Sequence, residues 1–146
     1  MLRSLLIGLV AGQRAMTPLA LVAGAARRDR LPEDAPGRAL IAHPLVATGA
    51  VTLAAAEMAG DKMRTAPDRI VLPGLVARTA TAAFAGAALA PAEQRKTAAV
   101  LAAATAIAAS YVGWTLRVRA MRRFGQSKTG FVEDALVLGS GLAITR

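Results

Sequence analysis

The stretch ALIAHPLVATGAVTLAAAEMAGD, residues 39 to 61, places two carboxylates at the end of an apolar run. Its first eighteen positions, Ala39 to Ala56, contain no Asp, Glu, Lys or Arg, and Glu57 and Asp61 then follow one helical turn apart. A run of this length is close to the ~20 residues that a helix needs to cross about 30 Å of hydrocarbon. The i, i+4 spacing places both acids on one helix face. The sequence therefore predicts a membrane-crossing helix with an acidic face at one end.

The overall composition fits a membrane protein better than a water-soluble one. The 146 residues are within the size of one domain, are 55% hydrophobic, and have a mean hydropathy of +0.45. A second charge-free run, Thr97 to Leu116, is twenty residues long. Because much of the apolar content is alanine, which gains little from burial in lipid, a soluble alanine-rich helical bundle is the alternative.

The net charge of +9 is assigned to membrane anchoring. Much of the positive charge lies in ARRDR (26–30) and RVRAMRR (117–123), at the ends of apolar segments, where Lys and Arg bind anionic headgroups. No RNA-binding aromatic pattern or zinc-finger spacing accompanies it, so we expect the lipid bilayer, and no nucleic acid, as a partner. The absence of cysteine excludes disulfides and thiolate metal sites.

Five helical segments are expected in one all-α domain covering residues 1–146. Proline, glycine and charged residues separate them, and residues 124–130 are expected to form a polar turn. The first segment is interpreted as a retained span, with a cleaved signal peptide as the alternative. The last segment is short for a transmembrane helix, so it either barely spans the membrane or packs partly inside the bundle. The prediction is a polytopic bundle of about four to five transmembrane segments, at roughly 3–26, 39–60, 70–90, 95–120 and 130–145.

Two short patterns bear on packing and ancestry. Gly8 and Gly12 form a G-x-x-x-G pair, which lets helix backbones approach closely, and we expect it to serve packing inside the bundle rather than dimerisation. The segment GLVA occurs at 8–11 and again at 74–77, each time shortly before an arginine. This indicates a weak internal repeat, although four matching residues arise easily in an alanine-rich chain.

Two arginines lie within expected spans, where an unpaired charge is costly. Arg14 and Arg78 each fall near the middle of a predicted segment, and an arginine there costs at least ~2.5 kcal/mol on insertion scales. Each should therefore face protein, water or an acidic partner. Pro18, four residues after Arg14, removes a helix hydrogen bond beside it.

Four acids are candidate partners for these arginines. Glu57 and Asp61 share a helix face, and Glu133 and Asp134 are expected in the first turn of the last helix, where the dipole favours carboxylates. We expect a buried polar cluster that either staples the bundle or binds an ion, a proton or a polar solute. In the alternative, Asp61 and Glu133 are interfacial helix ends without a buried role.

The chain resembles a bacterial membrane-protein family known as domain-of-unknown-function family 4126. The resemblance is carried by GQRAMTP, EMAGDKMRTAPD, VARTATAAFAGAAL, SYVGWTLR and GFVEDAL, in that order. The motif positions of that family fall on the residues Gly12, Arg14, Pro18, Glu57, Asp61, Pro67, Asp68, Arg78, Glu133 and Asp134. The resemblance implies an integral membrane protein of the bacterial inner membrane and supplies no activity.

Three functions are compatible with these residues. The first is a transporter or channel for an ion or small polar solute, working as a homodimer because 146 residues enclose little volume. In it Arg14 and Arg78 balance negative charge while Glu57, Asp61 and Glu133 are proton or cation sites. The second is an enzyme acting on a phosphorylated lipid, in which the acids, with Asp68, hold a divalent cation such as Mg²⁺. No resident cofactor is otherwise expected, and enzyme activity is uncertain. The third is a structural or accessory subunit.

Overall fold

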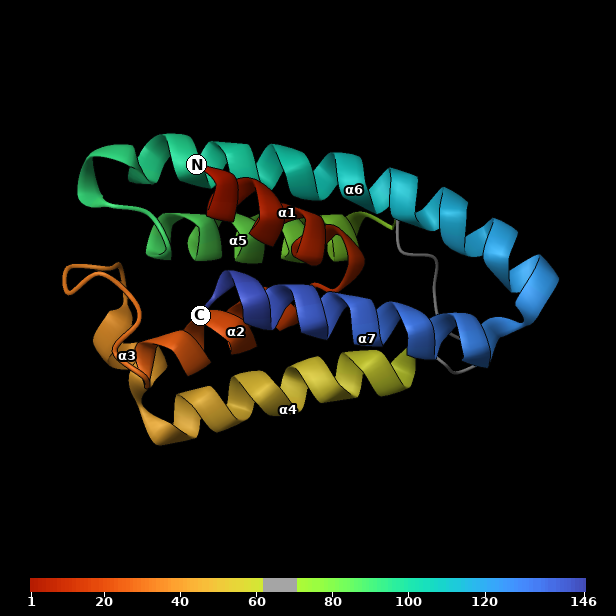
Figure 1. Cartoon of the computed structure of the whole chain (residues 1–146), viewed down its shortest axis with the longest axis horizontal. Helices are drawn as coiled ribbons and strands as arrows, with labels where there is room; N and C mark the ends of the chain where they lie inside the picture. Colours follow the sequence, from red (N-terminus) through yellow and green to blue (C-terminus); the bar gives the residue numbers. More distant parts are fainter. Residues whose placement is uncertain (62–70) are drawn as a thin grey trace.

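The computed structural model describes residues 1–61 and 71–146, and every regular element in this part of the chain is a helix. The predicted all-α fold is therefore confirmed. Figure 1 shows the main helices lying side by side along one long axis, with both termini toward the same end. The helices are α1 (Leu2–Gln13), α2 (Thr17–Ala26), α3 (Arg38–Ala42), α4 (Pro44–Gly60), α5 (Leu72–Ala88), the short 3-10 turn η1 (Ala92–Gln94), α6 (Arg95–Phe124) and α7 (Gln126–Ile144).

The expected first span, 3–26, is wrong as a single helix. It is divided into α1 and α2, and the chain reverses direction between them (Figure 1). Packing gives the same result. Gly8 and Gly12 of α1 lie against successively later residues of α6, so α1 runs in the direction of α6. Arg14 bonds to Asp134 and Leu21 lies against Gly141, so α2 runs in the direction of α7. Since α6 and α7 run in opposite directions, so do α1 and α2. At about 18 and 15 Å, neither crosses a bilayer alone.

The reversal has a local cause in Arg14 and Pro18. Arg14 has extended backbone angles, φ −141° and ψ 117°, and ends α1. Pro18 lies in the first turn of α2, where its missing N–H costs nothing and its fixed φ favours a helix start. The proline expected to disturb one helix therefore begins a second one.

Alanine and glycine let the α1–α2 hairpin pack at the centre of the bundle. α1 contacts α5, α6 and α7, and α2 contacts α3, α4, α5 and α7. A Cβ added at Gly12 would lie 2.5 Å from Ala109 Cβ, and one at Gly8 would lie 2.8 Å from Thr105 Cβ. The predicted internal role of the G-x-x-x-G pair is confirmed, because both of its glycines face α6 of the same chain.

The other predicted segments differ mainly at their ends. The segment 39–60 is broken at His43, whose extended backbone precedes Pro44, as the restriction on residues before proline requires. The expected polar turn at 124–130 is wrong, since α7 begins at Gln126 and the turn is reduced to Gly125, at φ 84°. Glu133 and Asp134 consequently lie two turns inside α7, and the helix-dipole argument for them fails.

One helix among the described residues is long and apolar enough to cross a membrane, namely α6 together with η1, Ala92–Phe124. Only 28% of its most apolar window is buried, which differs from the mostly buried core helix of a soluble protein. Four to five spans therefore stay a prediction.

Candidate functional site

The reversal between α1 and α2 creates backbone groups that need partners. Ala15 and Met16 lie between the helices, and their N–H groups have no helical acceptor one turn back. Both donate to the carboxylate of Glu57 on α4, at 2.6 Å from Ala15 and 2.8 Å from Met16. Glu57 thus caps the start of α2 from a neighbouring helix, and its negative charge lies at the positive end of that helix.

Arg14 is fully buried beside this cap and is bonded by two acids. Its Nε and Nη2 donate to Oδ1 of Asp134 at 2.9 and 2.6 Å, and its Nη1 donates to Oδ2 of Asp61. The Glu133 carboxylate is 4.0 Å from Nη2. The guanidinium therefore joins α1 to the end of α4 and to α7, and three acids compensate its burial.

Arg117 of α6 extends the cluster toward the surface. Its Nη1 donates to Oδ2 of Asp61 at 3.3 Å and to Oε2 of Glu133 at 3.2 Å, and its Nη2 donates to the Asp61 carbonyl at 2.8 Å. Positive and negative groups alternate in the order Asp134, Arg14, Asp61, Arg117 and Glu133, and we call these five residues the charge cluster. At the inner end of the cluster lies Arg14, whose side chain is fully buried. At its outer end lie Asp61 and Glu133, whose side chains are partly exposed.

Arg78 is buried on α5, and the charges of Glu57 and Asp61 attract it. The structure therefore brings together six of the seven predicted site residues: Arg14, Glu57, Asp61, Arg78, Glu133 and Asp134. The seventh, Asp68, lies outside the described residues. The alternative in which Asp61 and Glu133 are merely helix ends does not fit, because both bond to buried or nearly buried arginines.

Two hydrogen bonds give the level of Arg14 along α6. Ser110 Oγ donates to the Gly12 carbonyl at 3.2 Å, and Gln13 Nε2 donates to the Ala109 carbonyl at 3.1 Å. Because Arg14 directly follows these residues, its backbone lies near the level of Ser110 on α6. The first segment turns back at Arg14, so this residue ends a helix instead of lying inside one, and its depth in a membrane stays a prediction.

Sequence reasoning missed two contributors. Arg117 follows the charge-free run and precedes three more arginines, a pattern that predicts a headgroup anchor. Gln126, placed in the expected turn, donates its Nε2 to the Asp61 carbonyl at 3.3 Å. The signal for Arg117 is its position as the first cation after the apolar run, two residues before the next arginine of that stretch.

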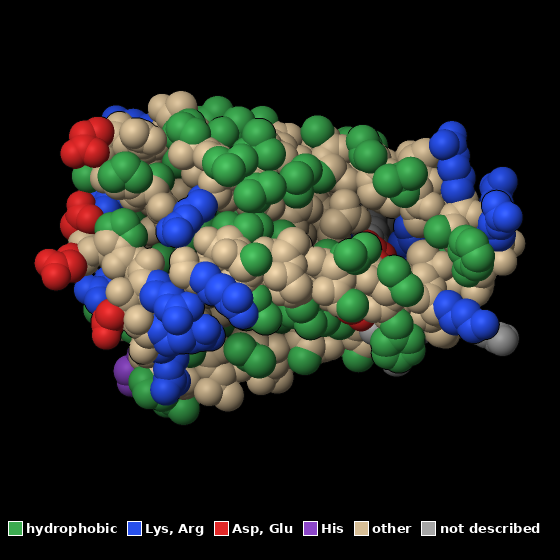
Figure 2. Space-filling model, viewed as in Figure 1, with side chains coloured by type: hydrophobic (Ala, Val, Ile, Leu, Met, Phe, Trp, Pro, Cys, Tyr) green, Lys and Arg blue, Asp and Glu red, His purple; other side chains and the backbone are tan. Residues whose placement is uncertain are grey.

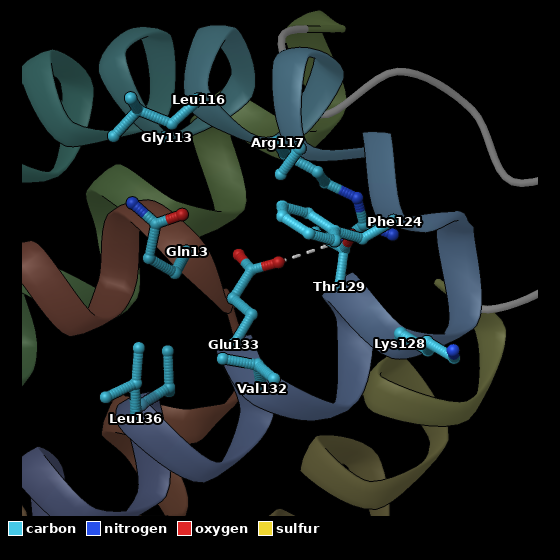
Figure 3. Close-up of a pocket in the computed structure, with 12 residues that line it drawn as sticks. Gln13, Gly113, Leu116, Arg117, Phe124, Lys128, Thr129, Val132, Glu133 and Leu136 are labelled. Atoms are coloured by element: carbon cyan, nitrogen blue, oxygen red, sulfur yellow. Dashed lines mark hydrogen bonds and ion pairs between the residues drawn. The ribbon is translucent and has the colours of Figure 1, made fainter. Parts of the chain in front are cut away.

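A cavity of about 680 Å³ opens beside the exposed end of the charge cluster. Figure 3 shows Arg117 and Glu133 on opposite walls of this cavity, joined by an ion pair, with Gln13 nearby. A second cavity of about 420 Å³ continues along α1, α6 and α7 and shares Gln13, Gly113, Leu116, Leu136 and Val137 with the first. We call the two together the lateral groove. Red acidic atoms are visible in a hollow on this face in Figure 2.

The described residues contain no group of three or more His, Cys, Asp or Glu side chains arranged to hold a metal ion. The three acids nearest one another, Asp61, Glu133 and Asp134, are instead directed at arginines. The geometry of these residues therefore does not support the divalent-cation site of the enzyme hypothesis.

No protein-family model, curated protein or solved structure matches the chain. The resemblance to domain-of-unknown-function family 4126 therefore stays a prediction from the motifs.

Proposed function

We propose that this chain is a multi-pass membrane protein of the bacterial inner membrane that moves a proton or another small cation through the charge cluster. The family resemblance supports the location. The observation that carries the function is the interrupted α1–α2 hairpin, whose reversal point holds a buried arginine within a chain of ionisable groups leading to an open cavity. Non-helical backbone at membrane depth is tolerated where it is enclosed by protein or lines a cavity, and it is typical of transport sites.

The outer surface supports the membrane location. Figure 2 shows most charged side chains toward the two ends of the long axis, with apolar side chains between them. A soluble monomer rarely exposes so continuous an apolar surface. Large apolar side chains at least 40% exposed occur on each of α4, α5, α6 and α7, for example at Leu45, Val51, Leu53, Leu72, Val76, Val100, Ile107, Val112, Leu116, Val132, Leu136 and Leu142.

The balance of charge favours a cation over an anion. Among the described residues the site holds four acids, Glu57, Asp61, Glu133 and Asp134, against the arginines at 14, 78 and 117. An excess negative charge away from water is costly unless a proton or cation neutralises it. Asp61 and Glu133 share Arg117, so a proton on either one leaves the other paired.

The proposal is tested by proton flux in proteoliposomes that carry an enclosed pH-sensitive dye. We expect wild-type vesicles to dissipate an imposed pH gradient faster than protein-free vesicles, and Glu133→Gln to slow this to the protein-free rate. Glu93→Gln is the matched control, because Glu93 is exposed at the opposite end of the bundle, and it should keep the wild-type rate. The same vesicles are assayed with Na⁺ and K⁺ gradients. Wild-type rates equal to protein-free rates for all three ions would contradict the proposal.

The accessory-subunit hypothesis predicts a different pattern. In that case the cluster only holds helices together, so Glu133→Gln should lower thermal stability and the yield of monodisperse protein in detergent. The wild type would show no ion flux. A variant that stays folded and loses flux favours transport.

We also propose that the working unit is a homodimer. The chain is short, and its exposed apolar faces leave area for a second copy. Amine-reactive crosslinking in native membranes should give a band at twice the monomer mass. A monomer alone, both there and in detergent, would contradict this assembly.

A further inference from the structure

The lateral groove lies between two helices that are consecutive in the chain yet do not close on each other. α6 and α7 are joined by Gly125 alone (Figure 1). Residues of both helices, together with residues of α1, line the groove. From Lys128 to Ile144 it follows α7 for about 24 Å, longer than the ~15 Å of one hydrocarbon leaflet. It opens sideways, on the face that carries exposed apolar residues.

The groove is polar at one end only. Arg117, Lys128, Thr129 and Glu133 line the end toward the α6–α7 turn (Figure 3). The other end, from Leu136 onward, has apolar walls apart from the Gln13 amide, where the two cavities join, and two hydroxyls. Such a lining matches an amphiphile that has one polar head and a long apolar tail.

The charges of the side chains at the polar end indicate which kind of headgroup would bind there. Glu133 is its one acid, and Arg117 offsets it at 3.2 Å. Lys128 is exposed at the rim, and Arg122 and Arg123 lie close by in the last turn of α6. Cations in this position attract anionic headgroups by about 1 kcal/mol each.

We propose that the lateral groove binds one anionic phospholipid, with an acyl chain between α6 and α7 and the phosphate at Lys128 and Arg117. A helix of a second copy fits this lining less well, because it would set apolar side chains against Arg117 and Glu133. The inference relies on the membrane location given above and is independent of ion flux.

Native mass spectrometry of protein extracted from bilayers of phosphatidylglycerol and phosphatidylcholine tests the site. We expect one phosphatidylglycerol retained per chain. Lys128→Gln should lower its occupancy about fivefold, and Leu136→Trp, which fills the groove from an exposed position, should abolish it. The matched controls Lys96→Gln and Val100→Trp change exposed residues away from the groove and should retain the lipid.

Two results would overturn the lipid site. The first is retention of both lipids at equal occupancy in the wild type, or of phosphatidylglycerol in Leu136→Trp. The second is quantitative disulfide dimerisation of Leu136→Cys in the bilayer, which would place a second copy in the groove; the chain contains no other cysteine to confuse this result. In the wild type, flux without retained phosphatidylglycerol, or retained phosphatidylglycerol without flux, separates this inference from the proposed function.

Discussion

The two sides of α6 differ in how closely a neighbour approaches. Toward α1, its alanines meet glycines, and the backbones come so close that no Cβ fits at Gly8 or Gly12 without displacing a neighbour. Toward α7, larger side chains such as Leu116 and Leu136 border a groove. In lipid, helices gain little from apolar contact alone, so tight packing of small residues determines which pairs associate. We infer from this difference that close packing of α1 against α6 holds the bundle together, whereas the groove between α6 and α7 leaves space for a ligand.

The strongest test of this comparison is Gly12→Leu. The new side chain would collide with Ala109 and with the backbone of α6, so we expect loss of folded protein or destabilisation of more than about 3 kcal/mol. Gly139→Leu is the matched control, because a Cβ at Gly139 meets nothing within 4 Å, and it should be nearly neutral. Thermal unfolding in detergent, followed by the fluorescence of the single tryptophan, measures both. Equal melting temperatures would show that the α1–α6 contact does not hold the bundle.

Asp134→Asn should have the next largest effect. It removes the charge that accepts two bonds from Arg14, a fully buried cation, and breaking such a pair costs about 3 kcal/mol. Asp29→Asn removes the acid of an ion pair with Arg38 that is largely exposed, and it should leave the unfolding temperature unchanged. If both variants melt alike, Asp61 and Glu133 suffice to compensate Arg14.

Glu57→Gln is expected to cost about 1 kcal/mol, the usual contribution of a helix cap. An amide offers one oxygen in place of the two that accept from Ala15 and Met16, and it removes the charge at the start of α2. Hydrogen exchange of those two amides should accelerate, while amides in the middle of α6 keep their rates. Unchanged protection would mean that the reversal is held by other contacts.

The smallest effect is expected on the open side of α6. Leu136→Ala shortens a side chain that is 68% exposed and lines the groove, so the unfolding temperature in detergent should hardly change. Phosphatidylglycerol should instead raise the melting temperature of the wild type more than that of the variant. A large loss of stability without lipid would show that α6 and α7 pack more closely than the groove implies.

The residues of the site could be chosen from the sequence because an ionisable group in an apolar segment needs a partner. Arg14 and Arg78 stand out for that reason, with Glu57, Asp61, Glu133 and Asp134 as their candidate partners, and the structure places these six residues together. Arg117 was missed because an arginine after an apolar run has a sufficient explanation as an anchor. The sequence also does not predict which acid pairs with which arginine, because pairing depends on which helices are neighbours.

The sequence by itself determined that this chain is helical, apolar and rich in small residues, and that its buried charges must compensate one another. Those properties follow from local composition and from the cost of burying charge. Only the tertiary structure decided that the first segment reverses at Arg14, which brings Glu57 to the start of α2 and Arg14 between the acids of α4 and α7. The physical reason is that hydropathy does not record chain direction, whereas the reversal is held by Pro18 and by a carboxylate more than forty residues away in the sequence.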